Sequence, residues 1–168
     1  YFSNNGFLSI TNDNDFQSFC SGNAGITVSN VGTIEKTSNG ISTFNTYSTF
    51  SNTGSIKGIG TYSFENTSLT QNGIIAPGNP IGILSINGMQ PLSGNSNLQI
   101  EFIDGSGPGT GHDQLIKSGN LLLDGILTVT QTGNIPSGSY TIISVSGGTI
   151  SGNFNAVNLP AGYTLAIN

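Results

Sequence analysis

The chain has 168 residues, of which 35% are hydrophobic and only 7% are charged, and its formal net charge is -5. Its cationic residues are lysines, and this acidic balance excludes a protein that binds nucleic acid by following the phosphates. One cysteine (Cys20) and one histidine (His112) are too few for a disulfide framework or a zinc cluster, so we expect Cys20 to be a small buried side chain.

Two further expectations concern export. No run of about eighteen apolar residues is present, so we expect no transmembrane helix. The first residue is Tyr1 rather than methionine, which favours a mature segment or a fragment of a longer protein.

The first half of the chain repeats a short phrase that begins with asparagine and continues with glycine. The asparagines are Asn30, Asn52 and Asn72, at intervals of 22 and then 20 residues, and the glycines are Gly32, Gly54 and Gly73. Degraded copies begin at Asn4 and Asn23. A period near twenty residues is typical of a solenoid. We therefore expect the three asparagines at equivalent corners of successive coils, in a hydrogen-bonded ladder, with Ile34, Ile56 and Ile75 in one inner stack.

Glycine interrupts the chain too often for helices, and short alternating runs predict strands instead. Residues 1–88 predict β-helix coils of about 20–22 residues. Residues 89–168 predict a continuation with longer strands that caps the solenoid, with strands at 97–103, 127–130, 140–145 and 163–167. The stretch 104–111 is too rich in glycine for a strand and predicts a loop.

Aromatic residues gather in the same repeats, at Phe44, Tyr47, Phe50, Tyr62 and Phe64. They fit either an exposed strip that stacks on sugar rings or an inner stack of a β-helix core. We favour the inner stack, because stacked aromatic rings are more common inside a β-helix core than in an exposed strip.

Three phrases follow one another in the second half of the chain. They are an Ala-Pro-Gly turn at Pro77 and Gly78, an acid-Gln-Leu strand start at Asp113, and a glycine before a Leu-x-Val strand at Gly125. In this order they resemble the passenger region of autotransporter-type bacterial surface proteins, over residues 72–168. The family has a Gly-Gly pair where this chain has Asp124 and Gly125.

The resemblance implies an all-β, right-handed parallel β-helix that is exported and displayed at the bacterial cell surface. The many Asn, Ser and Thr residues and the lack of arginine resemble surface proteins of Bacteroidota, where such chains are similar to type IX secretion cargo. The implied partners are surface glycans, other surface proteins, or the secretion machinery during export.

Several polar groups are candidates for chemistry. His112 and Asp113 are neighbours, but adjacent strand residues point to opposite faces, so we do not expect a catalytic pair. Gly109 to Asp113 matches the core of calcium-binding β-roll repeats, with Asp104 at the other end of the loop. Calcium takes six to eight oxygens, so we favour a plain loop over a calcium site at Asp104 and Asp113 and expect no cofactor.

Acidic and basic residues in the first half predict two further features. Asp13 and Asp15 would share a face of an extended segment, but their Asn-rich setting favours a turn. Glu35 and Lys36 on one coil and Lys57 on the next predict a weak surface ion pair across coils.

The sequence therefore favours a non-catalytic structural or adhesive segment, a stalk, of a large secreted surface protein. The motifs of the common nucleophile, phosphate and dinucleotide sites are missing, so we expect no enzyme. One alternative is a β-helix enzyme or binding module that acts on polysaccharide. Another is a filament subunit or a secretion cargo, with the open edge of the solenoid as its contact surface.

Overall fold

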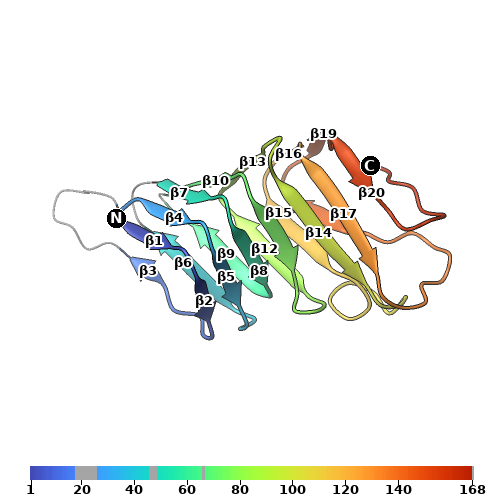
Figure 1. The fold of residues 1–168 in the computed structure, drawn as a ribbon, viewed down its shortest axis with the longest axis horizontal. Coiled ribbons are helices and arrows are strands. Elements are labelled where there is room, and N and C mark those ends of the chain that lie inside the picture. The colour runs from blue at the N-terminus through green and yellow to red at the C-terminus, as the bar shows by residue number, and fades with distance from the viewer. Residues whose placement is uncertain (18–25, 46–48, 66, 168) are drawn as a thin grey trace.

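The computed structural model describes residues 1–17, 26–45, 49–65 and 67–167. The described residues form strands and turns without helices, so the protein is all-β as expected. Strands of the same kind stack side by side along the longest axis, from the N-terminal strands at one end to the C-terminal strands at the other (Figure 1). The predictions for Cys20, Tyr47 and the phrase beginning at Asn23 fall outside the described residues.

Nearly every strand pairs in parallel with the strand three places further along the chain, which sorts the strands into three long sheets. Sheet A contains, in spatial order, β1 (Phe2–Asn4), β4 (Val28–Asn30), β7 (Thr49–Asn52), β10 (Ser68–Gln71) and β13 (Met89–Leu92). A short additional pair, β16 (Leu121–Leu123) and β19 (Ile150–Gly152), follows β13, with β16 against it.

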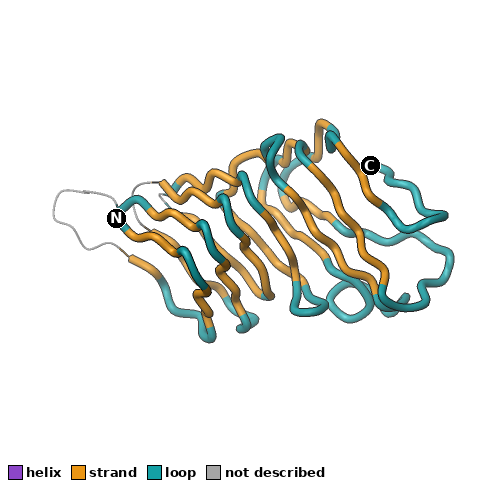
Figure 2. The backbone as a smooth tube through the Cα atoms, viewed as in Figure 1, coloured by secondary structure: helices purple, strands orange, loops and turns teal. Residues whose placement is uncertain are grey.

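Sheet B contains β2 (Phe7–Ile10), β5 (Thr33–Lys36), β8 (Ser55–Gly58), β11 (Ile74–Pro77), β14 (Asn97–Phe102), β17 (Ile126–Gln131) and β20 (Ala156–Asn158). Sheet C contains β3 (Phe16–Gln17), β6 (Ile41–Asn45), β9 (Gly60–Phe64), β12 (Ile83–Asn87), β15 (Gln114–Ser118) and β18 (Ile143–Ser146). We call three consecutive strands, one from each sheet, a coil; Figure 2 shows how turns join the strands from coil to coil. The arrangement is consistent with a parallel β-helix-like solenoid.

The strand pairing continues across residue 88, because β10 pairs with β13, β11 with β14 and β12 with β15. The longest strands, β14 and β17, lie beyond this point and have six residues each. The predicted strand at 163–167 is wrong, since this segment has no strand, and the strand predicted at 140–145 begins only at Ile143.

The core lies inside the coils because every second strand residue points inward. Ile34, Ile56 and Ile75 occupy paired positions of β5, β8 and β11, and each is 1% exposed, so the predicted inner stack is confirmed. Leu98 and Leu127 extend it along β14 and β17.

The expected aromatic core is confirmed for the described members Phe44, Phe50, Tyr62 and Phe64, which are all buried. Phe44 lies between Phe16 and Phe64, with ring centroids 4.6 and 5.3 Å apart and nearly parallel planes. Stacked rings thus repeat at one place in three successive coils.

Candidate functional site

A ladder of buried carboxamides runs along the corner between sheets A and B. Asn4 Nδ2 donates to Asn30 Oδ1 at 2.7 Å, and Asn30 Nδ2 donates to Asn52 Oδ1 at 2.6 Å. Asn52 Nδ2 donates to Gln71 Oε1 at 2.8 Å. Asn30 and Asn52 are completely buried, so each amide satisfies its neighbour where water cannot.

The structure corrects one member of the expected ladder. Gln71, not Asn72, pairs with Asn52, and the spacing of this step is 19 residues. Asn72 lies one residue further along, where its N–H donates to the Asn52 carbonyl. Asn4, which the sequence presents as a degraded copy, begins the ladder. At the other end Gln71 Nε2 is buried and has no partner within the described residues.

Replacing Asn52 with alanine is expected to lower the free energy of unfolding by about 2 kcal/mol, because the Asn30 amide and the Gln71 oxygen would both lose a buried partner. Urea denaturation of the variant measures this loss. Asn95→Ala, at an exposed position, is the matched control and should change stability by less than about 0.5 kcal/mol. Equal effects of both substitutions would contradict a structural role of the ladder.

Corner glycines accompany the ladder because successive coils approach closely there. A Cβ built on Gly32, Gly54 or Gly73 would lie 2.0 to 2.2 Å from the carbonyl oxygen of the glycine in the preceding coil. Those carbonyls accept N–H bonds from the next coil, such as Ser55 N to Gly32 O at 2.8 Å. The glycines therefore permit the backbone ladder at this corner.

The turn glycines of the second half also sit at coil corners. Gly125 precedes β17 with a φ of 73°, and a Cβ there would lie 2.3 Å from the Ser96 carbonyl. Pro77 is the last residue of β11, and Gly78 begins the turn that leads to β12. Both regions thus shape the connections between sheets, and Pro77 and Gly78 also line a groove on sheet B.

A buried lysine joins the first two coils, in contrast to the expected surface position of Lys36. Lys36 is fully buried, and its Nζ donates to Asp13 Oδ1 at 2.6 Å and to the Ser38 hydroxyl. The Lys36 hydrogen bond is the main cause that lowers the pKa of Asp13. Asp15 Oδ1 accepts the N–H of Thr43 at 2.9 Å, so both aspartates bind the following coil.

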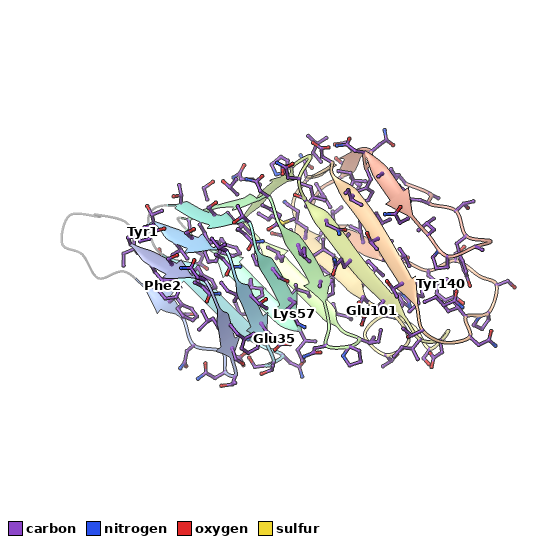
Figure 3. The ribbon with its side chains drawn as sticks, in the orientation of Figure 1. Tyr1, Phe2, Glu35, Lys57, Glu101 and Tyr140 are labelled. Atoms are coloured by element: carbon purple, nitrogen blue, oxygen red, sulfur yellow. The ribbon has the colours of Figure 1, made fainter. Side chains whose placement is uncertain are left out.

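The outer face of sheet B carries a groove of about 460 Å³ over β8, β11, β14 and β17, with the 78–80 turn at its side. Lys57 and Glu35 are paired residues of neighbouring strands, which Figure 3 labels. Their Nζ and Oε1 atoms are 3.6 Å apart. Asn79 Nδ2 donates to the same Glu35 oxygen. The predicted cross-coil ion pair is therefore present, but Glu35 is buried rather than at the surface.

Asp113 lies at the bottom of this groove and ties two elements together. Its Oδ1 accepts the N–H of Gly82 and its Oδ2 accepts the N–H of Glu101, both at 2.8 Å. Burial raises the pKa of Asp113 to about 7, against the effect of the two N–H bonds. Both carboxylate oxygens thus serve the fold.

The candidate calcium ligands bind different donors. Asp104 accepts hydrogen bonds from the backbone and the hydroxyl of Ser106, and the Ser106 hydroxyl is the main cause that lowers its pKa. Asp113 instead binds Gly82 and Glu101. Over the described ranges, no group of three or more His, Cys, Asp or Glu side chains is placed to hold a metal ion.

His112 is buried in an aromatic cluster, away from the groove that Asp113 lines. Its ring stacks on Phe102 with centroids 4.9 Å apart, and Tyr140 meets both rings edge to face. Burial lowers the pKa of His112, because the charged imidazolium would lose water. The structure therefore does not bring His112 and Asp113 together as a catalytic pair.

A cavity of about 720 Å³ lies at the C-terminal end of the core. Single residues of β14, β16, β17, β18 and β19 line it, together with Phe154 and residues of the segments 135–142 and 159–167. In the described part of the chain no helical segment has the length and apolarity to span a membrane.

Sequence reasoning missed the residues that complete the groove. Asn79, Gln99 and Glu101 come from a turn and a strand that are distant in sequence from Glu35 and Lys57, so only the fold reveals their proximity. Gln71 had a readable signal, since it stands two residues before Gly73 as Asn52 stands before Gly54. Comparisons of the chain with protein-family models, curated proteins and solved structures find no match.

Proposed function

We propose that the chain is a non-catalytic structural and adhesive segment, a stalk, of a large secreted protein of the bacterial cell surface. Its fold in this proposal is a right-handed parallel β-helix. The observation that carries the proposal is the continuity of the internal ladders: carboxamides, corner glycines, aliphatic side chains and aromatic rings each repeat at one place from coil to coil.

Such ladders suit a stalk because each coil is stabilised by its neighbours, so the rod grows by repetition without a new core. The low content of charged residues also suits a stalk, because like charges at equivalent positions of successive coils would lie about 4.8 Å apart along the sheet. An exposed rod of this kind holds a terminal or lateral binding surface away from the cell.

The groove on sheet B is the contact surface that we propose for adhesion. Lys57, Gln99 and Thr128 offer an ammonium group, an amide and a hydroxyl around it, and Ala76 leaves space between the flanking side chains. Donors and acceptors that are mixed around a groove match the hydroxyl groups of a sugar chain. A surface glycan is therefore the partner that this groove supports best.

Cleavage of polysaccharide is the second candidate function. It is favoured by two carboxyl groups that line the same groove, Glu101 and Asp113, because the raised pKa of Asp113 is suited to a general acid. Against it, Asp113 is 1% exposed and both of its oxygens already accept backbone N–H groups. We therefore place binding before cleavage.

The test incubates the purified chain with a panel of immobilised acidic and neutral polysaccharides. We expect retention on at least one of them, at least about tenfold weaker retention for Lys57→Ala combined with Gln99→Ala, and no new reducing ends or unsaturated products. Ser85→Ala, on the outer face of sheet C, is the matched control and should bind like the native chain.

Each part of the proposal has its own contrary result. Products that disappear in Asp113→Asn would make the chain an enzyme, and retention that ignores the groove substitutions would move the contact surface elsewhere. For the location, antibodies against the chain should label intact cells of the source organism. Labelling only after permeabilisation would contradict surface display.

A further inference from the structure

Among the described residues, the strands of the N-terminal coil have a partner on one side only. β1, β2 and β3 stand at the ends of sheets A, B and C, and each pairs there with one neighbouring strand of the described chain. We call this end, with the residues Tyr1 to Phe16, the N-terminal face; Figures 1 and 3 show it at one end of the rod. An open edge offers N–H and C=O groups to a further strand.

The carboxamide ladder has a direction, and at this face it offers an acceptor. In each step the Nδ2 atom of one coil donates to the side-chain oxygen of the following coil. Asn30 and Asn52 oxygens receive such a donor from the coil before them. Asn4 Oδ1 accepts a longer bond, 3.3 Å, from the Gly6 N–H of its own coil. A preceding coil with an amide at this corner would supply the donor that Asn30 and Asn52 receive.

Gly6 gives an independent indication that the N-terminal face receives another coil. A Cβ on Gly32, Gly54 or Gly73 would strike the glycine of the preceding coil, whereas a Cβ on Gly6 would meet nothing within 4 Å. Gly6 also lacks the left-handed φ found at Gly58 or Gly60. Within the described residues, neither sterics nor backbone conformation requires glycine here. A coil seated against this face would require it, as the other corners show.

Aromatic rings continue to the same face. Phe16, on the third strand of the first coil, stacks on Phe44, and 36% of it is exposed. Tyr1, Phe2 and Phe7 are exposed by 85%, 46% and 64%. Large rings exposed together beside open strand edges mark an interaction surface.

We propose that the N-terminal face binds a further parallel β-coil, added in the direction of the chain, that presents a carboxamide at the corner and an aromatic ring on its third strand. The carboxamide donates to Asn4 Oδ1, and the aromatic ring stacks on Phe16. The corner carbonyl of the added coil accepts the N–H of Phe7, as Gly32 O accepts that of Ser55.

A second copy of this chain fits the face poorly. After Gln71 the ladder position is occupied by Leu92. The last strands of this row, β16 and β19, end in Leu123 and Gly152, so none of these residues has a carboxamide to donate. Two N-terminal faces brought together would direct the Asn4 oxygens at each other, since the Asn4 Nδ2 already donates to Asn30 and to the Thr33 carbonyl. The face therefore fits a coil of the repeating type, not an end of this chain.

The test adds such a coil to the full chain. A copy of residues 49–67 is fused directly before Tyr1, which takes the place that Ser68 has after the original, because Ser68 pairs with Thr49. The copied asparagine and phenylalanine then correspond to Asn52 and Phe64. Hydrogen exchange of the Phe7 amide is measured against a fusion that carries the same 19 residues in shuffled order.

We expect the copied coil to slow exchange at Phe7 by about tenfold or more relative to the shuffled extension. Gly6→Ala should be harmless in the native chain but destabilising in the fusion, where the added coil occupies the space. Changing the copied Asn52 to leucine should remove most of the protection. Together these results would assign the face to a coil.

Two results would overturn the proposal. Equal exchange at Phe7 in the copied and shuffled fusions would show that the face does not receive a coil. Protection of Phe7 in the unmodified chain that grows with protein concentration, together with a dimer in light scattering, would assign the face to a second copy. Because these measurements do not involve glycans, their failure is separate from failure of the proposed adhesive function.

Discussion

Replacing Gly54 with alanine is expected to lower the free energy of unfolding by about 3 kcal/mol or more. The added Cβ would lie 2.0 Å from the Gly32 carbonyl oxygen, and backbone atoms surround it, so a side chain cannot move aside to relieve the contact. The same carbonyl accepts the Ser55 N–H that joins the two coils. A shift large enough to admit the methyl group would therefore weaken the hydrogen bonds of the corner.

Urea denaturation followed by circular dichroism measures this loss. Gly6→Ala is the matched control, because it changes the same corner position of the first coil, where a Cβ would meet nothing within 4 Å. It should leave stability within about 0.5 kcal/mol or raise it slightly by restricting the unfolded chain. Similar losses for both substitutions would mean that conformational freedom, not the close approach of coils, explains the corner glycines.

The repeat was readable because the corners of a solenoid impose the same demand in each coil. The close approach needs glycine, and the buried corner needs a side chain that both donates and accepts, so Asn-x-Gly recurs. The inner stack of Ile34, Ile56 and Ile75 follows from the same register. Alignment by asparagine rather than by glycine explains the error at Asn72, because Gln71 fills the role with a longer amide.

The charged groups were less predictable, because their partners are fixed by the stacking of coils. Lys36 looks like a surface residue in its own segment, yet Asp13 and Ser38 surround its ammonium group. Glu35 meets Asn79, which is 44 residues away in sequence. The cavity at the C-terminal end could not be predicted from the sequence either. Residues of the segment 159–167 line it, and this segment does not form the strand that was expected at 163–167.

The loop after β14 shows the same limit for a candidate site. The pattern from Gly109 to Asp113 predicts either a plain loop or calcium ligands, and both treat Asp113 as part of its local segment. In the structure its oxygens reach Glu101 and Gly82, which are 12 and 31 residues away. The carboxylate is an internal brace between β14 and the turn before β12, a role that local spacing does not encode.

This brace leads to a pH dependence of stability. Burial raises the pKa of Asp113 from 3.8 to about 7, so the folded protein holds a proton that the unfolded chain releases. The stabilising contribution of this group is fully present below about pH 3.8 and is lost as the pH rises through 7. At about 1.4 kcal/mol for each pKa unit, the change is on the order of 4 kcal/mol.

His112 changes the stability with pH in the opposite direction, so the experiment must separate its contribution from that of Asp113. Burial lowers the pKa of His112, so its contribution is present above the ordinary histidine value of 6.5 and is lost as the pH falls through the lowered pKa. The stability difference between the native chain and Asp113→Asn removes this effect, because both proteins keep His112. Urea denaturation at several values between pH 4 and pH 8 supplies that difference.

We expect the native chain to lose stability relative to Asp113→Asn as the pH rises over this range, most steeply between the unfolded pKa of 3.8 and the folded pKa of about 7, with the loss levelling off at higher pH. The difference in free energy of unfolding between the two proteins at any one pH also contains the cost of the side-chain amide that the substitution places at position 113, which accepts one of the two N–H groups and opposes the other. The test therefore uses the change of this difference with pH. A stability difference that stays constant from pH 4 to pH 8 would mean that Asp113 is ionised throughout, and that its two N–H bonds outweigh the burial of its charge.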